Sequence, residues 1–476
     1  MKKFLSFFIS SILWVSISSA AYGQENDQKS QIQQFVNESI NEYQIPGASL
    51  AIVKEGKVVF QENWGVQSDG KRITNNTLFT IGSISKPITS LAIMKLVQEG
   101  KINLDESIYS YLHSFNYEKE NFENEITVRH LLSHTSGISS KDGLEVADLT
   151  LREKDSIKKA TEILNGVVLN HEPGSIHQYS AANYLLLGRI IEEVSGFQFP
   201  EYIRKEITSK LGMDHTVADY RQAIKLGYTP GYQAWFGKPI KSVNHFDNSG
   251  VPYGYIASTS SDMIKFIKFL LGNQKLLDQK NFKEYTSPQV HRKEEFYYGL
   301  GWRISTSRQD SYLFHGGETP DSRAELFIHP SKQYGFILLT NKNNISDVMH
   351  TTYIREGIRN IIERNRVSHI IPADYKLQWI TLLTIIIFTF FSFWLVFHLR
   401  KHKLITFVNR ILGSIYLVLA LTIIPILELI VDSPCRTISL YGSDIAILIK
   451  CFIAICVVFS IVLFLQDKII KFVKKV

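Results

Sequence analysis

A serine and a lysine stand three residues apart at the start of an apolar segment, IGSISKPITSLAIMKL (Ile81–Leu96). Pro87 is tolerated only in the first turn of a helix, so the helix is expected to begin close to Ser83. Residues three apart on a helix are neighbours, which places the Ser83 hydroxyl and the Lys86 amine on one face. Burial of Lys86 in this apolar helix would disfavour its charged form. The pattern therefore predicts a serine nucleophile beside a lysine that can act as its base.

Two further segments carry groups that could assist such a serine. Tyr179 lies in the loop before a helix expected to begin near Ala181, where a phenol can face a cleft; a tyrosine packed within the loop is the alternative. The run His315, Gly316 and Gly317 ends one predicted strand, and its glycines would let a substrate approach the backbone closely. His315 could equally be a hydrogen-bonded histidine at a strand edge.

Neither a metal nor another cofactor is predicted. None of the fourteen histidines belongs to an HExxH motif or a comparable ligand pattern. All three cysteines lie near the C-terminus, so the rest of the chain has no disulfide and no thiol nucleophile. They are Cys435, Cys451 and Cys456.

Strand-like segments occur at both ends of the central region, with helix-like segments between them. The predicted strands are Ala48–Lys54, Lys57–Gly65, Tyr297–Ser305, Ser311–Gly317, Ser322–Pro330 and Tyr334–Asn341. The predicted helices are Gln31–Tyr43, Pro87–Glu99, Thr127–Ser133, Ala181–Val194, Phe199–Leu211, Ser261–Leu271 and Ile345–Glu363. This order predicts an α/β fold, in which helices flank one antiparallel sheet built from both ends of the region. The central helices would form a second lobe, with a cleft between the lobes.

Both ends of the chain are strongly apolar. At the N-terminus, two lysines precede an apolar run and small residues, which predicts a signal peptide over residues 1–23 rather than a membrane anchor. At the C-terminus, Leu377–Phe397, Ile411–Val431 and Ile445–Leu465 are each long enough to cross a bilayer core of about 30 Å. We therefore expect an extracytoplasmic domain (24–367), a linker (368–376) and a three-helix transmembrane anchor in the lipid bilayer (377–476).

The distribution of basic residues predicts the orientation of the anchor. Basic residues fill the first break between the apolar stretches and the C-terminal tail: Arg400, Lys401, Lys403, Arg410, Lys468, Lys471, Lys474 and Lys475. The positive-inside rule places both segments in the cytoplasm. The sequence thus predicts a multi-pass protein of the cell membrane with its catalytic domain on the extracytoplasmic side.

The remaining charged residues give less information about function. The formal net charge of +7 comes mostly from the anchor, so the domain is nearly neutral and no nucleic-acid partner is predicted. Glu428 and Lys450 lie inside the second and third apolar stretches. They could pair between helices, or each could extend to the membrane interface, and the sequence leaves both readings open.

The order of these motifs resembles the serine β-lactamase and penicillin-binding-protein superfamily, in its class C and D-alanyl-D-alanine-carboxypeptidase-like branch. Segments around them, such as IPGASLAIVKEGKVV, ITVRHLLSHTSGI and PYGYIASTSSDM, are similar to that family as well. The resemblance implies that Ser83 attacks a carbonyl and becomes acylated, while Lys86 and Tyr179 share the acid–base work. It also implies that the backbone N–H groups of Ser83 and Glu318, next to His315–Gly317, form the oxyanion hole.

Two positions depart from the family pattern. The family's Tyr-x-Asn motif reads Tyr179-Ser180-Ala181, and Asn183 lies two residues further on, out of register. His315 stands where the family often has the lysine of Lys-Thr-Gly, and a mostly neutral histidine attracts a substrate carboxylate poorly. Both changes weaken the case for β-lactam or D-Ala-D-Ala substrates and leave acyl transfer itself intact.

Three other polar residues near these motifs are interpreted as scaffold. His134 in LLSHTSGI is expected to cap a turn rather than to act in catalysis. Arg323 and Glu325 alternate on a predicted strand; they could flank the cleft, but a solvated strand face is preferred.

A β-lactamase-like domain followed by three spans also resembles the membrane-bound peptidases that mature nonribosomal peptide prodrugs by removing an acyl-D-asparagine leader. The predicted function is thus a membrane-anchored serine hydrolase acting through an acyl-enzyme on a small peptide or amide with a D-residue near the scissile bond. The substrate would be of prodrug or cell-wall type. The alternatives are an esterase or weak β-lactamase of the same fold, and a non-catalytic penicillin sensor or wall-binding protein.

Overall fold

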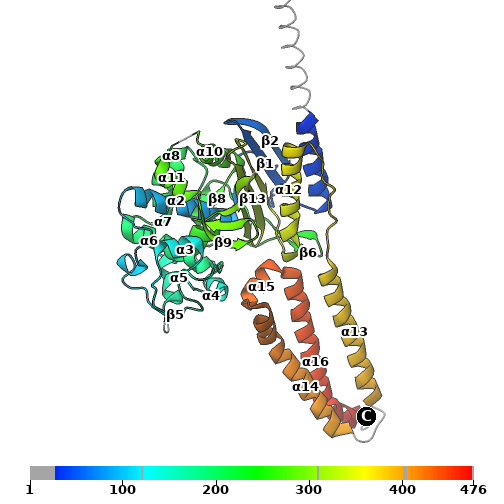
Figure 1. Ribbon diagram of the computed structural model, residues 1–476. Helices are drawn as coiled ribbons and strands as arrows, with labels where there is room; N and C mark the ends of the chain where they lie inside the picture. The colour runs from blue at the N-terminus through cyan, green and yellow to red at the C-terminus, as the bar shows by residue number, and fades with distance from the viewer. Residues whose placement is uncertain (1–26, 120–121, 274, 308–309, 400–404, 474–476) are drawn as a thin grey trace, which may run out of the picture.

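The computed structural model describes residues 27–119, 122–273, 275–307, 310–399 and 405–473 (Figure 1). The predicted signal peptide lies outside these ranges, as do five of the basic residues that predict the orientation of the anchor: Arg400, Lys401, Lys403, Lys474 and Lys475. The described chain forms a domain built on a central sheet, followed by a bundle of long helices that extends from one side of it.

The central sheet has eight strands in the order β2-β1-β14-β13-β12-β11-β10-β9. Their bounds are β1 (Gly47–Lys54), β2 (Lys57–Gly65), β9 (Pro288–Lys293), β10 (Phe296–Gly299), β11 (Arg303–Thr306), β12 (Ser311–Thr319), β13 (Ser322–His329) and β14 (Tyr334–Thr340). All neighbouring pairs are antiparallel. The prediction of one antiparallel sheet built from both ends of the domain is therefore confirmed.

Two strand predictions were wrong in detail. The predicted strand Tyr297–Ser305 is a hairpin of β10 and β11, because the chain reverses around Gly301, which has a φ of +83° that favours glycine. The run His315–Gly317 does not end its strand, since β12 continues to Thr319 and pairs there with Ser322. The start of β11, at Arg303, lies opposite Phe314 in the middle of β12.

Successive side chains of β1 point to opposite faces of the sheet, and each face packs against its own hydrophobic core. Ala51 and Val53 join the core shared with the helical lobe, whereas Leu50 and Ile52 join the core beneath α12 (Val348–Arg364) and the helix of residues 27–42. Figure 1 shows these two helices side by side on that face, while α10 (Ser260–Leu270) covers the other and α2 (Ser85–Gln98) belongs to the helical lobe beyond it.

The helical lobe is inserted between β2 and β9. Its other helices are α3 (Val128–Ser133), α4 (Ser140–Glu145), α5 (Ser156–Leu164), α6 (Ala181–Ser195), α7 (Phe199–Tyr202), α8 (Ser209–Leu211), α9 (Tyr220–Lys225) and α11 (Gln279–Tyr285). The segment predicted as one helix, Phe199–Leu211, is continuous but contains a π-helical stretch, Ile203–Thr208, between α7 and α8. The short helices α4, α5, α9 and α11 were not predicted.

Arg323 and Glu325 are buried, with 4% and 1% exposed, so the prediction of a solvated strand face was wrong. The reason is that α12 covers this face of β13: Arg355 of α12 donates to Glu325 Oε2 at 2.9 Å. Arg323 Nη1 in turn binds the Glu318 carboxylate at 2.7 Å. These ion pairs fix β13 against α12 and hold the side chain of Glu318.

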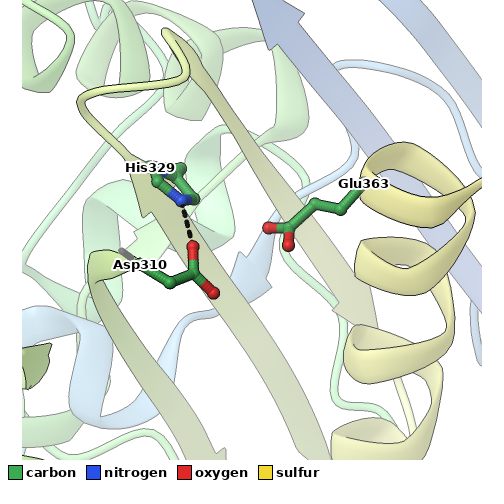
Figure 2. A group of neighbouring side chains, drawn as sticks. All are labelled: Asp310, His329 and Glu363. Carbon is green, nitrogen blue, oxygen red and sulfur yellow. Dashed lines mark hydrogen bonds and ion pairs between the residues drawn. The ribbon is translucent and has the colours of Figure 1, made fainter. Parts of the chain in front are cut away.

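A second charged cluster joins the far end of α12 to the sheet (Figure 2). Asp310, His329 and Glu363 lie close enough for their ligand atoms to share an ion. However, Lys332 Nζ binds both Asp310 and Glu363 at 3.1 Å, and Arg359 also binds both carboxylates. Because two cations already neutralise the carboxylates, the cluster is explained as an ion-pair network that ties α12 to the sheet.

Three long apolar helices follow the domain: α13 (Lys376–Leu399), α14 (Ile405–Val431) and α16 (Ser443–Val473). By length and composition, Lys376–His398, Phe407–Val431 and Ser443–Gln466 could each cross a membrane. The prediction of three such helices is confirmed.

A short helix, α15 (Cys435–Tyr441), lies between α14 and α16 and was not predicted. Glu428 Oε1 accepts a hydrogen bond from the backbone N–H of Cys435, the first residue of α15, at 2.7 Å. Among the residues that the structure describes, no ion pair joins Glu428 to Lys450. The contact made by Glu428 is thus with α15 rather than with the third long helix.

Candidate active site

The local fold places Ser83 at the junction of the sheet and the helical lobe. After β3 (Phe79–Thr80), the 3₁₀ turn Gly82–Ile84 leads directly into α2. Gly82 has a φ of +53°, a conformation in which a Cβ atom is strained. Eleven residues of α2 are buried, among them Lys86, because this helix runs through the middle of the core.

Two polar side chains meet at the Ser83 hydroxyl. Lys86 Nζ lies 3.1 Å from Ser83 Oγ and also donates to the carbonyl oxygen of Tyr253 at 2.8 Å. The Tyr179 hydroxyl donates to Ser83 Oγ at 2.8 Å. Tyr179 comes from the loop before α6, so residues far apart in the sequence converge on one oxygen atom.

The environment of Lys86 favours its neutral amine. Only 2% of the residue is exposed, and burial lowers its pKa from the ordinary value of 10.5. The Tyr179 phenol partly offsets this effect, while the nearby Arg303 guanidinium lowers the pKa further. A neutral amine has a lone pair that can accept the proton of Ser83.

Two glycines bring the backbone of Ser83 and Glu318 together. The pairing of β11 with β12 ends at Phe314, and the 3₁₀ turn packs against the part of β12 beyond it. A Cβ atom on Gly82 would collide with the Glu318 backbone nitrogen, and one on Gly317 would collide with the Ile81 carbonyl oxygen. This close approach sets the two backbone segments side by side, as an oxyanion hole requires.

His315 is buried and both of its ring nitrogens have partners. Nδ1 donates to the Gly316 carbonyl oxygen at 2.7 Å, because a carbonyl can only accept, and Nε2 therefore accepts from the Tyr298 hydroxyl at 3.3 Å. Burial lowers the pKa of His315 well below its usual range, helped by Arg303 and Lys86. The imidazole is thus neutral: it accepts a hydrogen bond from Tyr298 and supplies no positive charge.

His134 supports Tyr179. It ends α3 in the left-handed conformation, with a φ of +59°, as expected for a residue that caps a turn. Its buried Nδ1 accepts from the Ser180 backbone N–H at 3.2 Å and from Asn183 Nδ2 at 2.9 Å, and its ring packs 4.3 Å from that of Tyr179. The Asn183 side chain is therefore bound to His134, and it does not take the place of the asparagine that the Tyr-x-Asn motif has where this chain has Ala181.

Arg303 also lies near the site, although no sequence motif predicted it. Its Cζ lies 6.0 Å from the ring centroid of Tyr179, its buried Nε has no hydrogen-bond partner, and it has no ion pair among the described residues. A second guanidinium, that of Arg292, lies close enough to interact with it. Burial lowers the pKa of Arg292, and the positive charge of Arg303 lowers it further. The missed β10–β11 hairpin is what carries Arg303 to the site. An unneutralised cation here could bind an anionic group.

Comparison with known proteins shows the family to which the chain belongs. The family profile described as Beta-lactamase matches residues 31–358. The chain therefore belongs to the beta-lactamase family, whose members include serine hydrolases. Protein flp of Staphylococcus aureus (strain N315) is 28% identical over 467 residues, covering 94% of this chain and 93% of that protein. Coverage this complete means that the similarity extends into the C-terminal helices.

Solved structures share the fold of the domain. The octameric penicillin-binding protein homologue from Pyrococcus abyssi is 27% identical, with a TM-score of 0.59 over 66% of this chain and 73% of that chain. The D-alanine carboxypeptidase AmpC from Burkholderia cenocepacia is 19% identical, with a TM-score of 0.57 over 70% of this chain and 99% of that chain. The second likeness concerns the fold alone.

Proposed function

We propose that the protein is a membrane-anchored, extracytoplasmic serine hydrolase that forms an acyl-enzyme on Ser83. Its substrates would be peptides or amides with a D-residue near the scissile bond. The observation that carries the proposal is the position of Ser83 Oγ between Lys86 Nζ at 3.1 Å and the Tyr179 hydroxyl at 2.8 Å. A binding protein would not need a desolvated amine beside a serine, whereas a nucleophile does. The preference for a D-residue is supported by the family resemblance.

The proposed reaction follows from these positions. Ser83 Oγ bonds to the substrate carbonyl carbon while its proton passes to the neutral Lys86 amine. The backbone N–H groups of Ser83 and Glu318 stabilise the negative charge on the carbonyl oxygen. The proton then passes through Tyr179 to the leaving nitrogen, and the C–N bond breaks. A water molecule then attacks the carbonyl carbon of the ester, its proton passes by way of Tyr179 and Lys86 to Ser83 Oγ, and the C–Oγ bond breaks to release the acid.

Arg303 supports a substrate with a carboxylate close to the scissile bond. The neutral His315 cannot supply the charge that a lysine would give at this position. The Arg303 Cζ atom lies 6.0 Å from the ring centroid of Tyr179, and its guanidinium has no ion pair among the described residues, so Arg303 can take this role from the neighbouring strand. A carboxylate bound there would sit on the leaving-group side of Ser83, where Tyr179 delivers its proton.

The placement of the domain relative to the long helices supports an extracytoplasmic site. The domain and α15 lie at one end of the bundle, and the ends of α13 and α14 that flank residues 400–404 lie at the other (Figure 1). If that basic segment is cytoplasmic, the domain lies outside the membrane. The linker keeps the domain near the helices, because the Ile371 carbonyl oxygen accepts from the Tyr43 hydroxyl at 2.8 Å.

Intact-mass spectrometry of the full-length protein with a fluorophosphonate tests the proposed nucleophile. We expect one adduct on the wild-type protein, formed as Ser83 Oγ displaces fluoride, and no adduct on Ser83→Ala. A folded wild-type protein that gains no adduct would contradict the enzyme and favour a non-catalytic binding protein. An adduct that persists on Ser83→Ala would place the nucleophile elsewhere.

Replacing Arg303 with methionine is expected to raise KM for a peptide with a free carboxylate by about 10–100-fold, the equivalent of one charge-assisted contact. The matching peptide amide should bind equally well to both proteins. Removal of this cation should also raise the pKa of Lys86, so the rising limb of the pH–rate profile should move to higher pH. Steady-state kinetics on the two peptides across a pH series measures both effects.

Arg364→Met is the matched control, because Arg364 is exposed at the end of α12, across the sheet from Ser83. An equal rise in KM for the acid and amide peptides in Arg303→Met would show that Arg303 does not bind the substrate carboxylate.

A further inference from the structure

Helix α15, between the second and third long helices, docks on the catalytic domain. Arg436 Nη2 lies within hydrogen-bond distance of three backbone carbonyl oxygens at the end of α4: Leu144 at 3.0 Å, Glu145 at 2.8 Å and Ala147 at 2.9 Å. Figure 1 shows α15 beside α4 at the boundary between the domain and the bundle. Nη2 has two N–H groups, so these carbonyl oxygens share its hydrogens, and the Leu144 oxygen also accepts from the Ala147 backbone N–H.

The opposite end of α4 holds Tyr179. Ser140, the first residue of α4, donates through Oγ to the Tyr179 carbonyl oxygen at 2.7 Å. Gly143 packs so closely on Ser180 that a Cβ atom at this position would collide with the Ser180 hydroxyl. Helix α4 therefore contacts Arg436 at one end and the backbone of Tyr179 at the other.

A second contact of α15 leads to Lys86. The Tyr441 hydroxyl, at the end of α15, lies 3.4 Å from Asp148 Oδ1, and the same oxygen accepts from the Tyr255 hydroxyl at 2.5 Å. Tyr255 ends the π-helical segment Val251–Tyr255, which also contains Tyr253, the residue whose carbonyl oxygen accepts from Lys86. The two contacts of α15 thus reach both partners of Ser83.

Both ends of α15 are fixed. Glu428 accepts from its first backbone N–H, as described above. Just beyond its last residue, Asp444 accepts from Asn344 Nδ2 and from the Phe236 backbone N–H, both at 3.3 Å. Residues Phe236 and Asn344 belong to the domain, so α15 is held between the long helices and the domain.

We propose that α15 is a positioning element of the catalytic centre, and that Arg436 and Tyr441 set the placement of Tyr179 and Lys86 around Ser83. The inference rests on the proposed function. Neither residue touches the reacting atoms; each acts through backbone that carries a catalytic side chain. The long helices would then do more than tether the enzyme, because Ser83 reaches its full rate only with the anchor docked.

The test uses the full-length protein in detergent and measures Ser83 acylation against fluorophosphonate concentration. This yields a limiting rate constant and an apparent Kd for the probe. Arg436→Met is expected to lower the limiting rate constant by about 10–100-fold, since small displacements of catalytic groups have effects of this size. The apparent Kd and the thermal unfolding temperature should match those of the Arg364→Met control. Arg436→Lys, which can still donate to carbonyl oxygens, should recover part of the rate.

A double-mutant cycle with Ser140→Ala tests the route through α4. If Arg436 acts on Tyr179 through this helix, the losses in the double variant should be smaller than the product of the single losses. A wild-type rate in Arg436→Met, or fully multiplicative losses, would overturn the proposal. A wild-type protein that does not react at all would instead overturn the proposed function, and this inference with it.

Discussion

Replacing Lys86 with methionine is expected to lower the rate of Ser83 acylation by about 10³-fold or more and to raise the thermal unfolding temperature. The rate falls because the amine 3.1 Å from Ser83 Oγ is the proton acceptor, and a positioned base contributes about 10²–10⁴-fold. Methionine resembles lysine in shape, so it fills the same space without a polar atom. Its one disadvantage is that the Tyr253 carbonyl oxygen loses a donor.

The stability gain has a defined dependence on pH. Burial lowers the pKa of Lys86 in the folded protein below its ordinary value of 10.5. The folded state therefore binds a proton on this amine less readily than the unfolded state does. The resulting loss of folding stability is fully present below the folded-state pKa. It disappears as the pH rises through the unfolded value. We expect Lys86→Met to raise the unfolding temperature by about 2–4 °C near neutral pH and by less as the pH approaches 10.5.

Thermal unfolding monitored by circular dichroism across a pH series measures this effect, and fluorophosphonate kinetics measures the rate. Ser83→Ala is the matched control, because it abolishes acylation and leaves the buried lysine in place. Its unfolding temperature should follow the pH dependence of the wild type. An acylation rate within tenfold of the wild type in Lys86→Met would show that another group takes the proton.

The pair Ser83 and Lys86 could be predicted from the sequence because local geometry determines it. Three-residue spacing in a helix that starts near Pro87 places both groups on one face whatever the rest of the fold does. The position of Tyr179 could not be predicted from local geometry, since only the packing of α3 and α6 brings its loop to Ser83. The family resemblance was what placed Tyr179 beside Ser83 in the prediction.

The residues that could not be predicted from the sequence depend on contacts between distant segments. Arg303 reaches the site only because β10 and β11 form a hairpin, a turn that the continuous apolar pattern of YYGLGWRIS concealed. Arg323 and Glu325 look like solvent-facing residues on their own strand, and only the position of α12 buries them. Arg436 sits in a break between apolar stretches, and no local signal indicates that it binds α4.

Replacing Gly317 with alanine is expected to lower the acylation rate by about 10²–10³-fold, the loss associated with one oxyanion-hole donor. The new Cβ atom would collide with the Ile81 carbonyl oxygen, which is backbone and cannot rotate away. Strand β12 must then separate from the 3₁₀ turn that carries Ser83. That movement takes the Glu318 N–H away from Ser83 while Lys86 and Tyr179 remain in place.

Gly316→Ala is a matched control one residue away, because its Cβ atom would lie 3.3 Å from the side-chain oxygens of Glu325 rather than near backbone. A small side-chain adjustment should suffice there, so we expect Gly316→Ala to react within about fivefold of the wild type, a loss below 1 kcal/mol. Acylation kinetics and unfolding temperatures of both variants separate the local effect from general destabilisation. Equal rates in the two alanine variants would mean that the contact between β12 and the turn at Ser83 does not build the oxyanion hole.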